Sequence, residues 1–145
     1  MSVSIRGTLQ GTQVTLVHGP SGAVVATVPP VDNGGDGSRF SPTDLCAASL
    51  GACAATIAGM YAARAGIPLE ALDFEVVKEM TASAPRRIAR LTVAFRATTS
   101  CTDQEFQRLA AAARTCPVRL SLGEGVEVVE TWERASGPDK GRGMR

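Results

Sequence analysis

The first part of the chain alternates short hydrophobic segments with turn sequences. β-Branched residues are concentrated at positions 3–9, 14–17 and 23–28, and these segments predict three strands. The last two are separated by HGPSG, whose glycines and proline are typical of a hairpin turn. Residues 29–40, PPVDNGGDGSRF, contain two prolines and three glycines and therefore predict a mobile loop.

A long segment without charge follows. Residues 45–63 carry nineteen uncharged side chains in succession, a length that also suits a membrane-spanning helix. Most of these residues are small, and the large aliphatic ones are Leu45, Leu50, Ile57 and Met60. The segment is therefore too weakly hydrophobic for a membrane span. Its all-round apolarity instead predicts a helix that is buried on all sides in a globular protein.

Capping signals predict where this helix begins and ends. Ser41 is a favourable N-cap, Pro42 occupies the favoured first helical position, and Asp44 completes a capping box. Gly66, followed by Pro68, marks the C-terminal end. The sequence thus predicts a helix of roughly six turns between Ser41 and Gly66.

Alternation of hydrophobic and polar residues returns after the long helix. Residues 74–80 and 87–97 predict two strands of an antiparallel hairpin. The sequence TDQE at 102–105 is a capping box that precedes an amphipathic helix. The apolar stripe of this helix consists of Phe106, Leu109, Ala110 and Ala113. A short helical turn within residues 115–123 and a strand over residues 126–132 complete the pattern.

The order of the predicted elements is βββαββαβ, which indicates an α+β fold rather than a strictly alternating α/β fold. We expect an antiparallel sheet that wraps around the long, buried central helix. A chain of 145 residues can bury one core. Residues 1–135 are therefore predicted to form a single domain, and residues 136–145 a disordered tail.

Small residues recur every four positions along the long helix. Ala47, Gly51, Ala55 and Gly59 form a ridge with almost no side chain, where another backbone can approach closely. Because the chain has only four Phe, one Tyr and one Trp, we expect the ridge to pack against the same helix of a second subunit. Packing of the ridge on the chain's own sheet is the alternative.

Charge and cysteine content narrow the classes of function. Fifteen basic and fourteen acidic residues give a net charge of +1, without the basic, aromatic-rich stripe that nucleic-acid binding favours. The N-terminal sequence does not have the pattern of a secretory signal, so we expect a cytoplasmic, thiol-reducing location. The four cysteines have no zinc-binding spacing and are too few for a disulfide scaffold. The four thiols are therefore expected either to pack as inert side chains or to take part in redox chemistry.

Two of the cysteines lie on the long helix. Cys46 and Cys53 are two turns apart, about 10 Å, whereas a disulfide requires Cα atoms within about 7 Å. A partner for Cys53 must therefore come from elsewhere. Cys116 is the candidate, because it precedes Pro117 at the start of a helical turn, where the helix dipole lowers a thiol pKa. The alternative for Cys53 is a small inert hydrophobe, and Cys101 is expected to be incidental.

Two motifs of the chain closely resemble the OsmC/Ohr family of thiol-dependent hydroperoxide reductases. They are SPTDLCAASLGAC at residues 41–53 and A-x-x-x-x-CPV at residues 111–118, in the same order and spacing. The resemblance covers roughly residues 41–132 and includes GIPLEALDFEV at residues 66–76. It implies an intertwined homodimer in which strands of both subunits cover two buried central helices, with active sites at the subunit interface.

The same resemblance implies a peroxidase that works with two thiols and needs no cofactor or metal. In such proteins an organic hydroperoxide oxidises the cysteine at the position of Cys53 to a sulfenic acid. The cysteine at the position of Cys116 then captures the sulfenic acid as a disulfide. An external thiol reduces this disulfide, and dihydrolipoyl groups do so in the well-studied members. An apolar, alanine-lined site suits organic hydroperoxides better than hydrogen peroxide.

The chain departs from the family pattern at Thr43. Members with strong peroxidase activity carry a Glu at this position, ten residues before the reactive cysteine, and its carboxylate orients an Arg that holds the thiolate. Asp44 lies about 2.5 turns from Cys53, so it faces away and is expected to cap the helix instead. Arg39 in the glycine-rich loop is the candidate for the thiolate-stabilising Arg. The alternative function is an OsmC-like redox-sensing or small-molecule-binding dimer without efficient peroxidase turnover.

Overall fold

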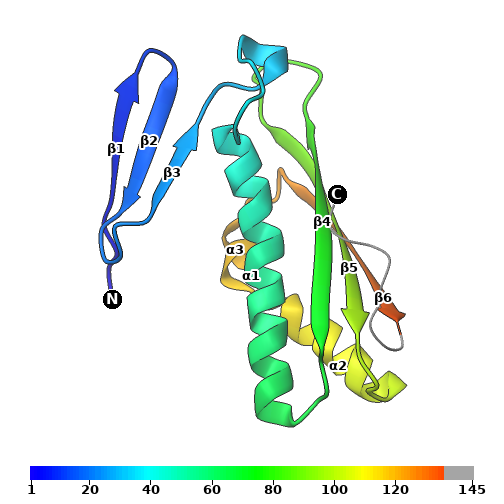
Figure 1. Ribbon diagram of the computed structural model, residues 1–145. Helices are drawn as coiled ribbons and strands as arrows, with labels where there is room; N and C mark the ends of the chain where they lie inside the picture. Colours follow the sequence, from blue (N-terminus) through cyan, green and yellow to red (C-terminus); the bar gives the residue numbers. More distant parts are fainter. Residues whose placement is uncertain (136–145) are drawn as a thin grey trace. The chain divides into compact units, whose positions relative to one another are not determined.

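The computed structural model describes residues 1–135, which fall into two compact units, Met1–Cys46 and the part from Ala47 onward. The element order is β1, β2, β3, the short 3-10 helix η1, α1, β4, β5, α2, α3 and β6 (Figure 1). This order confirms the α+β class predicted from the sequence. The predicted tail, residues 136–145, lies outside the described residues, and the single domain over residues 1–135 stays a prediction.

The first unit begins with a three-stranded antiparallel sheet in the order β1–β2–β3. Its elements are β1 (Ile5–Gln10), β2 (Gln13–His18), β3 (Val24–Thr27) and η1 (Val31–Asn33). Gly11 lies in the two-residue turn between β1 and β2 with φ 61°, a conformation that glycine adopts without strain. After β3, the backbone N–H of Val28 donates to the carbonyl of Phe40 at 3.1 Å. This bond closes the predicted loop at its base.

Helix α1 (Pro42–Ala65) begins at the predicted capping box. The backbone N–H of Ser41 donates to Asp44 Oδ2 at 2.9 Å, and the backbone N–H of Asp44 donates to Ser41 Oγ at 3.1 Å. At the other end Gly66 has φ 67°, the left-handed conformation typical of the residue after a helix. Both predicted ends of the long helix are therefore confirmed.

Burial along α1 follows one face of the helix. The buried residues are Ala47, Leu50, Gly51, Ala54, Ala58 and Ala62. Met60 is 51% exposed within residues 1–135, so burial on all sides does not hold for the single chain. The reason is that β4, β5 and α2 cover only one face of the helix. By length and composition α1 could also cross a membrane, a property that core helices of soluble proteins share.

The second unit contains a mixed three-stranded sheet in the order β4–β5–β6. Its elements after α1 are β4 (Ala71–Met80), β5 (Ile88–Thr98), α2 (Asp103–Ala113), α3 (Pro117–Ser121) and β6 (Glu127–Ala135). β4 and β5 form the predicted antiparallel hairpin, with Phe74 opposite Phe95. β6 pairs with β5 in parallel, so the prediction of an antiparallel sheet does not extend to this strand. The reason is that α2 and α3 connect β5 to β6, a crossover that parallel pairing requires.

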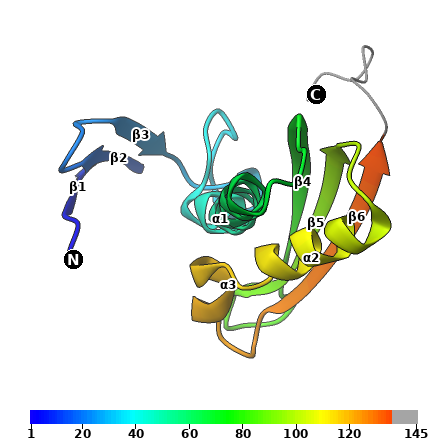
Figure 2. The same ribbon diagram turned by 90° about the horizontal axis from the view of Figure 1, so that it is seen from below.

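The core of the second unit consists of side chains from α1, α2 and the sheet. Leu91, Val93 and Phe95 alternate along β5 and are at most 2% exposed. They form one cluster with the alanines of α1 and with Leu109 and Ala113 of α2. Figure 2, which looks along α1, shows this helix beside β4.

The small-residue ridge of α1 has two different environments. A Cβ atom on Gly51 would lie 2.4 Å from Cε2 of Phe74 and 2.8 Å from Cγ2 of Val76, both on β4. A Cβ atom on Gly59 would meet nothing within 4 Å among the described residues. The alternative interpretation of the ridge, packing on the chain's own sheet, therefore holds at Gly51, whereas the ridge at Gly59 is open in the single chain.

Candidate active site

Cys53 lies in the middle of α1 and is partly buried. Its side chain packs against the buried cluster that includes Ala54, Leu109 and Cys116. All four cysteines of the chain fall within residues 1–135, and none of them forms a disulfide in the structure.

Cys116 joins α2 to α3 and is fully buried. It is the N-cap residue of α3, with φ −63° and ψ 139°, and Pro117 follows at the first helical position. The Cys116 Sγ atom accepts a hydrogen bond from the backbone N–H of Arg119 at 3.4 Å. The backbone N–H of Cys116 donates to the carbonyl of Ala113 at 3.2 Å, which ties the residue to the end of α2.

The structure places Cys53 against the cluster that contains Cys116, near enough for the Cys53 thiol to act on the pKa of the Cys116 thiol. Burial raises the pKa of the Cys116 thiol above its ordinary value. The hydrogen bond from the backbone of Arg119 acts in the opposite direction, whereas the Cys53 thiol and the Glu130 carboxylate raise the pKa further. The expectation that a helix N-terminus lowers the pKa of Cys116 is therefore wrong, because one N–H donor does not offset the loss of water around the sulfur.

Glu130 is a functional candidate that the sequence analysis did not identify. Its side chain is only 5% exposed, and Arg119 Nη1 donates to its Oε2 atom at 2.6 Å. Trp132 Nε1 donates to the other carboxylate oxygen, Oε1, at 2.5 Å. The available signal was the alternation of β6, which places Val128, Glu130 and Trp132 on one face. An acidic residue on an apolar strand face requires a partner.

The other predicted site residues, Arg39, Thr43 and Asp44, belong to the first unit. Asp44 closes the capping box of α1, as expected. Thr43 Oγ1 lies 3.1 Å from Ser41 Oγ. Arg39 is exposed, and its charge adds to two hydrogen bonds from Ser38 in lowering the pKa of a nearby acid, Asp36. The roles assigned to Arg39 and Thr43 in thiolate stabilisation stay predictions.

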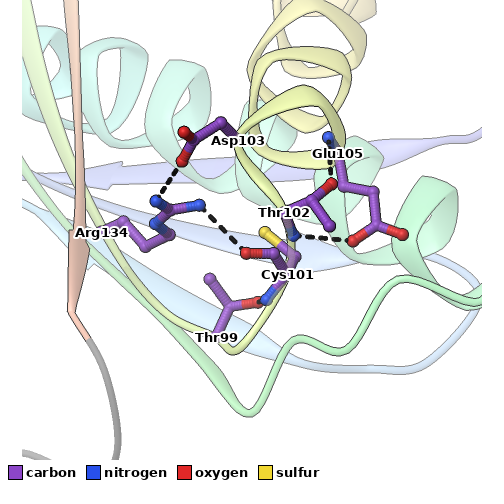
Figure 3. A network of polar contacts seen from close by, with 6 residues as sticks. All are labelled: Thr99, Cys101, Thr102, Asp103, Glu105 and Arg134. Atoms are coloured by element: carbon purple, nitrogen blue, oxygen red, sulfur yellow. Dashed lines mark hydrogen bonds and ion pairs between the residues drawn. The ribbon is translucent and has the colours of Figure 1, made fainter.

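Cys101 belongs to a different polar network at the start of α2 (Figure 3). Its backbone N–H donates to Thr99 Oγ1 at 3.0 Å, and its carbonyl accepts from Arg134 Nη1 at 3.0 Å. Arg134 also pairs with Asp103 in the first turn of the helix. Next to this pair, Thr102 forms the predicted capping box of α2. The network fixes the start of α2 to β6.

Within residues 1–135, no three His, Cys, Asp or Glu side chains are grouped as metal ligands would be.

Comparisons with known proteins agree on one family. The family model for OsmC-like proteins matches residues 35–131. The crystal structure of a Psychrobacter arcticus 273-4 protein, named for an osmotic stress and detoxification response, is 33% identical. It covers 89% of this chain and 94% of its own, with a TM-score of 0.83. A search of curated proteins finds no match.

Two more distant structures share the fold. The organic hydroperoxide resistance protein OsmC of Legionella pneumophila is 21% identical with a TM-score of 0.72, over 92% of this chain and 97% of its own. The organic hydroperoxide resistance protein OhrB of Bacillus subtilis is 16% identical with a TM-score of 0.67, over 92% and 98%.

Proposed function

The chain belongs to the OsmC family, and we propose that it is a thiol-dependent peroxidase that reduces organic hydroperoxides. The close approach of Cys53 to Cys116 is the observation that supports this proposal most strongly. A peroxidase of this kind needs one sulfur to be oxidised and a second sulfur within bonding reach. The two residues come from α1 and from the α2–α3 junction, so two separate parts of the fold would supply the two sulfur atoms.

The proposed reaction has two steps. The thiolate of Cys53 attacks the terminal oxygen of the peroxide, the O–O bond breaks, and the departing alkoxide takes up a proton to become an alcohol. The resulting sulfenic acid on Cys53 then reacts with the thiol of Cys116. The S–S bond forms, and the hydroxyl group leaves with the thiol proton as water. The peroxide gains the two electrons that the two thiols lose.

The surroundings of Cys53 favour a substrate with a hydrocarbon group. The side chains that form a cluster with Cys53 are apolar, among them Ala54 and Leu109. Burial of hydrocarbon against such a surface contributes about 25 cal/mol per Å², which hydrogen peroxide cannot gain. The fold is shared with proteins named for organic hydroperoxide resistance, which agrees with this preference.

An external dithiol must return the enzyme to its reduced state. We propose a dihydrolipoyl group as the reductant, because a dithiol can reduce the Cys53–Cys116 disulfide by exchange and leave as a cyclic disulfide. This requirement agrees with the cytoplasmic, thiol-reducing location predicted from the sequence.

We also propose that the functional protein is a homodimer. In the single chain the open part of α1 includes Met60 and Gly59. The first unit exposes further apolar side chains, namely Ile5, Leu9, Val24 and Val25. Exposed apolar surface of this kind favours association, and two-fold pairs are the commonest oligomers.

Light scattering tests the homodimer proposal. Met60→Glu should yield monomers, whereas Gln107→Glu on the exposed face of α2 should leave the dimer intact. A wild-type monomer would contradict it.

A turnover assay tests the peroxidase function. Cumene hydroperoxide should consume dihydrolipoamide catalytically in the wild type, and Cys53→Ser should abolish this consumption. Cys101→Ser is the matched control, since Cys101 lies in a separate network, and it should retain turnover. Stoichiometric oxidation without turnover would favour the redox-sensing alternative.

A second variant tests the departure from the family pattern at Thr43. If the wild type is limited by the absence of a Glu carboxylate at this position, Thr43→Glu should raise the turnover rate. An unchanged rate would remove this explanation.

A further inference from the structure

The buried carboxylate of Glu130 is connected to the candidate active site through Arg119. Both oxygens of the carboxylate are engaged, one by Arg119 Nη1 at 2.6 Å and the other by Trp132 Nε1 at 2.5 Å. The side chain of Arg119 is 28% exposed, whereas that of Glu130 is 5% exposed. A carboxylate this deeply buried is costly unless it is paired, so the ion pair fixes Arg119 to β6.

Arg119 is also the residue whose backbone contacts the sulfur of Cys116. Its N–H donates to Cys116 Sγ at 3.4 Å. The ion pair to Glu130 holds the side chain of the same residue, and therefore restrains the turn that carries both the donor and the sulfur. Within residues 1–135, the groups that act on this sulfur are the Cys53 thiol of α1, the backbone N–H of Arg119 in α3 and the Glu130 carboxylate of β6. The charged side chain of Arg119 pairs with Glu130.

This inference rests on the proposed peroxidase function. We propose that Arg119 and Glu130 are positioning residues for disulfide formation, which place Cys116 Sγ against Cys53 and tune its reactivity through the balance of their opposite charges. The step is the condensation in which the Cys53 sulfenic acid loses its hydroxyl group and Cys116 supplies the proton for the water that leaves. Arg119 and Glu130 contribute no atom to this reaction.

The two charges act on the Cys116 proton in opposite directions. The negative charge of Glu130 favours the protonated thiol and raises the pKa of Cys116. Arg119 forms an ion pair with this carboxylate, and we expect its positive charge to offset part of the effect of Glu130. Glu130→Gln should therefore lower the pKa of Cys116, and Arg119→Met, which leaves the carboxylate without its cation, should raise it.

A purely structural pair predicts a different result. If Arg119 and Glu130 only anchored α3, either substitution would loosen the turn and let water reach the sulfur. Both variants would then shift the pKa of Cys116 in the same direction. The sign of the two shifts therefore separates electrostatic tuning from simple anchoring.

The first experiment titrates Cys116 as the single thiol, with the other three cysteines replaced by serine. Thiolate formation is followed by ultraviolet absorbance, which requires no reagent to reach the buried sulfur. We expect a lower midpoint for Glu130→Gln, a higher midpoint for Arg119→Met, and a midpoint near that of the parent for Arg119→Lys. Arg134→Met is the matched control, because it removes another ion pair of β6, and it should leave the midpoint unchanged. Shifts of the same sign, or no shifts, would overturn the proposal.

The second experiment measures the disulfide-forming step in the protein with all four cysteines. Trp132, the only tryptophan of the chain, donates to Glu130 and reports on this region by its fluorescence. After one equivalent of cumene hydroperoxide, Glu130→Gln and Arg119→Met should form the disulfide about tenfold more slowly, as expected for lost positioning. Unchanged rates would overturn the proposal. The titration needs no peroxide, so its outcome is independent of whether the protein turns over.

Discussion

Gly51 lies on the face of α1 that packs against β4, and its replacement by alanine tests this packing quantitatively. The added Cβ would lie 2.4 Å from Phe74 Cε2 and 2.8 Å from Val76 Cγ2. Ordinary carbon contacts begin near 3.5 Å, so the Phe74 ring must move by about 1 Å. Phe74 cannot move freely, because it packs on Phe95 with ring centroids 5.9 Å apart.

The expected cost of this substitution follows from two opposing effects. Overpacking of a core costs about 1–3 kcal/mol, whereas replacing a mid-helix glycine by alanine stabilises by about 1 kcal/mol. Gly51→Ala should therefore reduce the free energy of unfolding by up to about 2 kcal/mol. Both variants are compared in the monomeric Met60→Glu background, which removes the proposed dimer contact of α1. There Gly59→Ala has the same gain in helix propensity without a contact to the added Cβ, so it should not destabilise the chain. The difference between the two variants, about 1–3 kcal/mol, isolates the overpacking.

Urea denaturation of both variants measures this difference, with light scattering to verify that the oligomeric state is unchanged. A double-mutant cycle adds a direct check. Phe74→Leu shortens the side chain that the new Cβ would meet, so Gly51→Ala should cost less in that background than in the wild type. Equal stabilities for Gly51→Ala and Gly59→Ala, or strictly additive effects with Phe74→Leu, would refute the described packing of α1 on β4.

Three further predictions concern other parts of the second unit. Phe95→Ala should lower the free energy of unfolding by about 3–5 kcal/mol and change the fluorescence of Trp132, on which Phe95 stacks at 4.4 Å; an unchanged spectrum would contradict the stacking. Thr102→Ala removes the capping box of α2 and should cost about 1 kcal/mol, measured by urea denaturation, with Gln104→Ala as an exposed control. The raised pKa of Cys116 means that the folded state keeps this proton after the unfolded chain has lost it. The corresponding stability is present below the unfolded thiol pKa and is lost as pH rises through the folded pKa. Cys116→Ser should therefore lose less stability than the wild type in alkaline urea titrations, and parallel pH profiles would contradict this.

The features that the sequence predicted well are those that depend on neighbouring residues. The capping boxes at Ser41 and Thr102 and the helix end at Gly66 were confirmed, because each requires only a few residues in succession. The alternation along β5 likewise predicted its buried face correctly. Such patterns describe one segment at a time.

The features that the sequence missed depend on which segments meet. Alternation along β6 predicts the faces of the strand but does not determine its direction, so parallel pairing with β5 was not foreseen. Gly51 and Gly59 belong to the same four-residue repeat of α1. Among the described residues, however, side chains of β4 pack against Gly51 and no atom lies near Gly59. The pKa of Cys116 depends on burial by other elements and on Glu130, 14 positions further along the chain.

The account depends most on the claim that Cys53 and Cys116 form the redox pair. Mass spectrometry tests this after one equivalent of cumene hydroperoxide and alkylation of the remaining thiols. We predict a disulfide-linked pair of peptides that contain Cys53 and Cys116, with Cys46 and Cys101 alkylated. Alkylated Cys116 beside a Cys53 that is oxidised to sulfinic acid, or a disulfide between other cysteines, would contradict the claim.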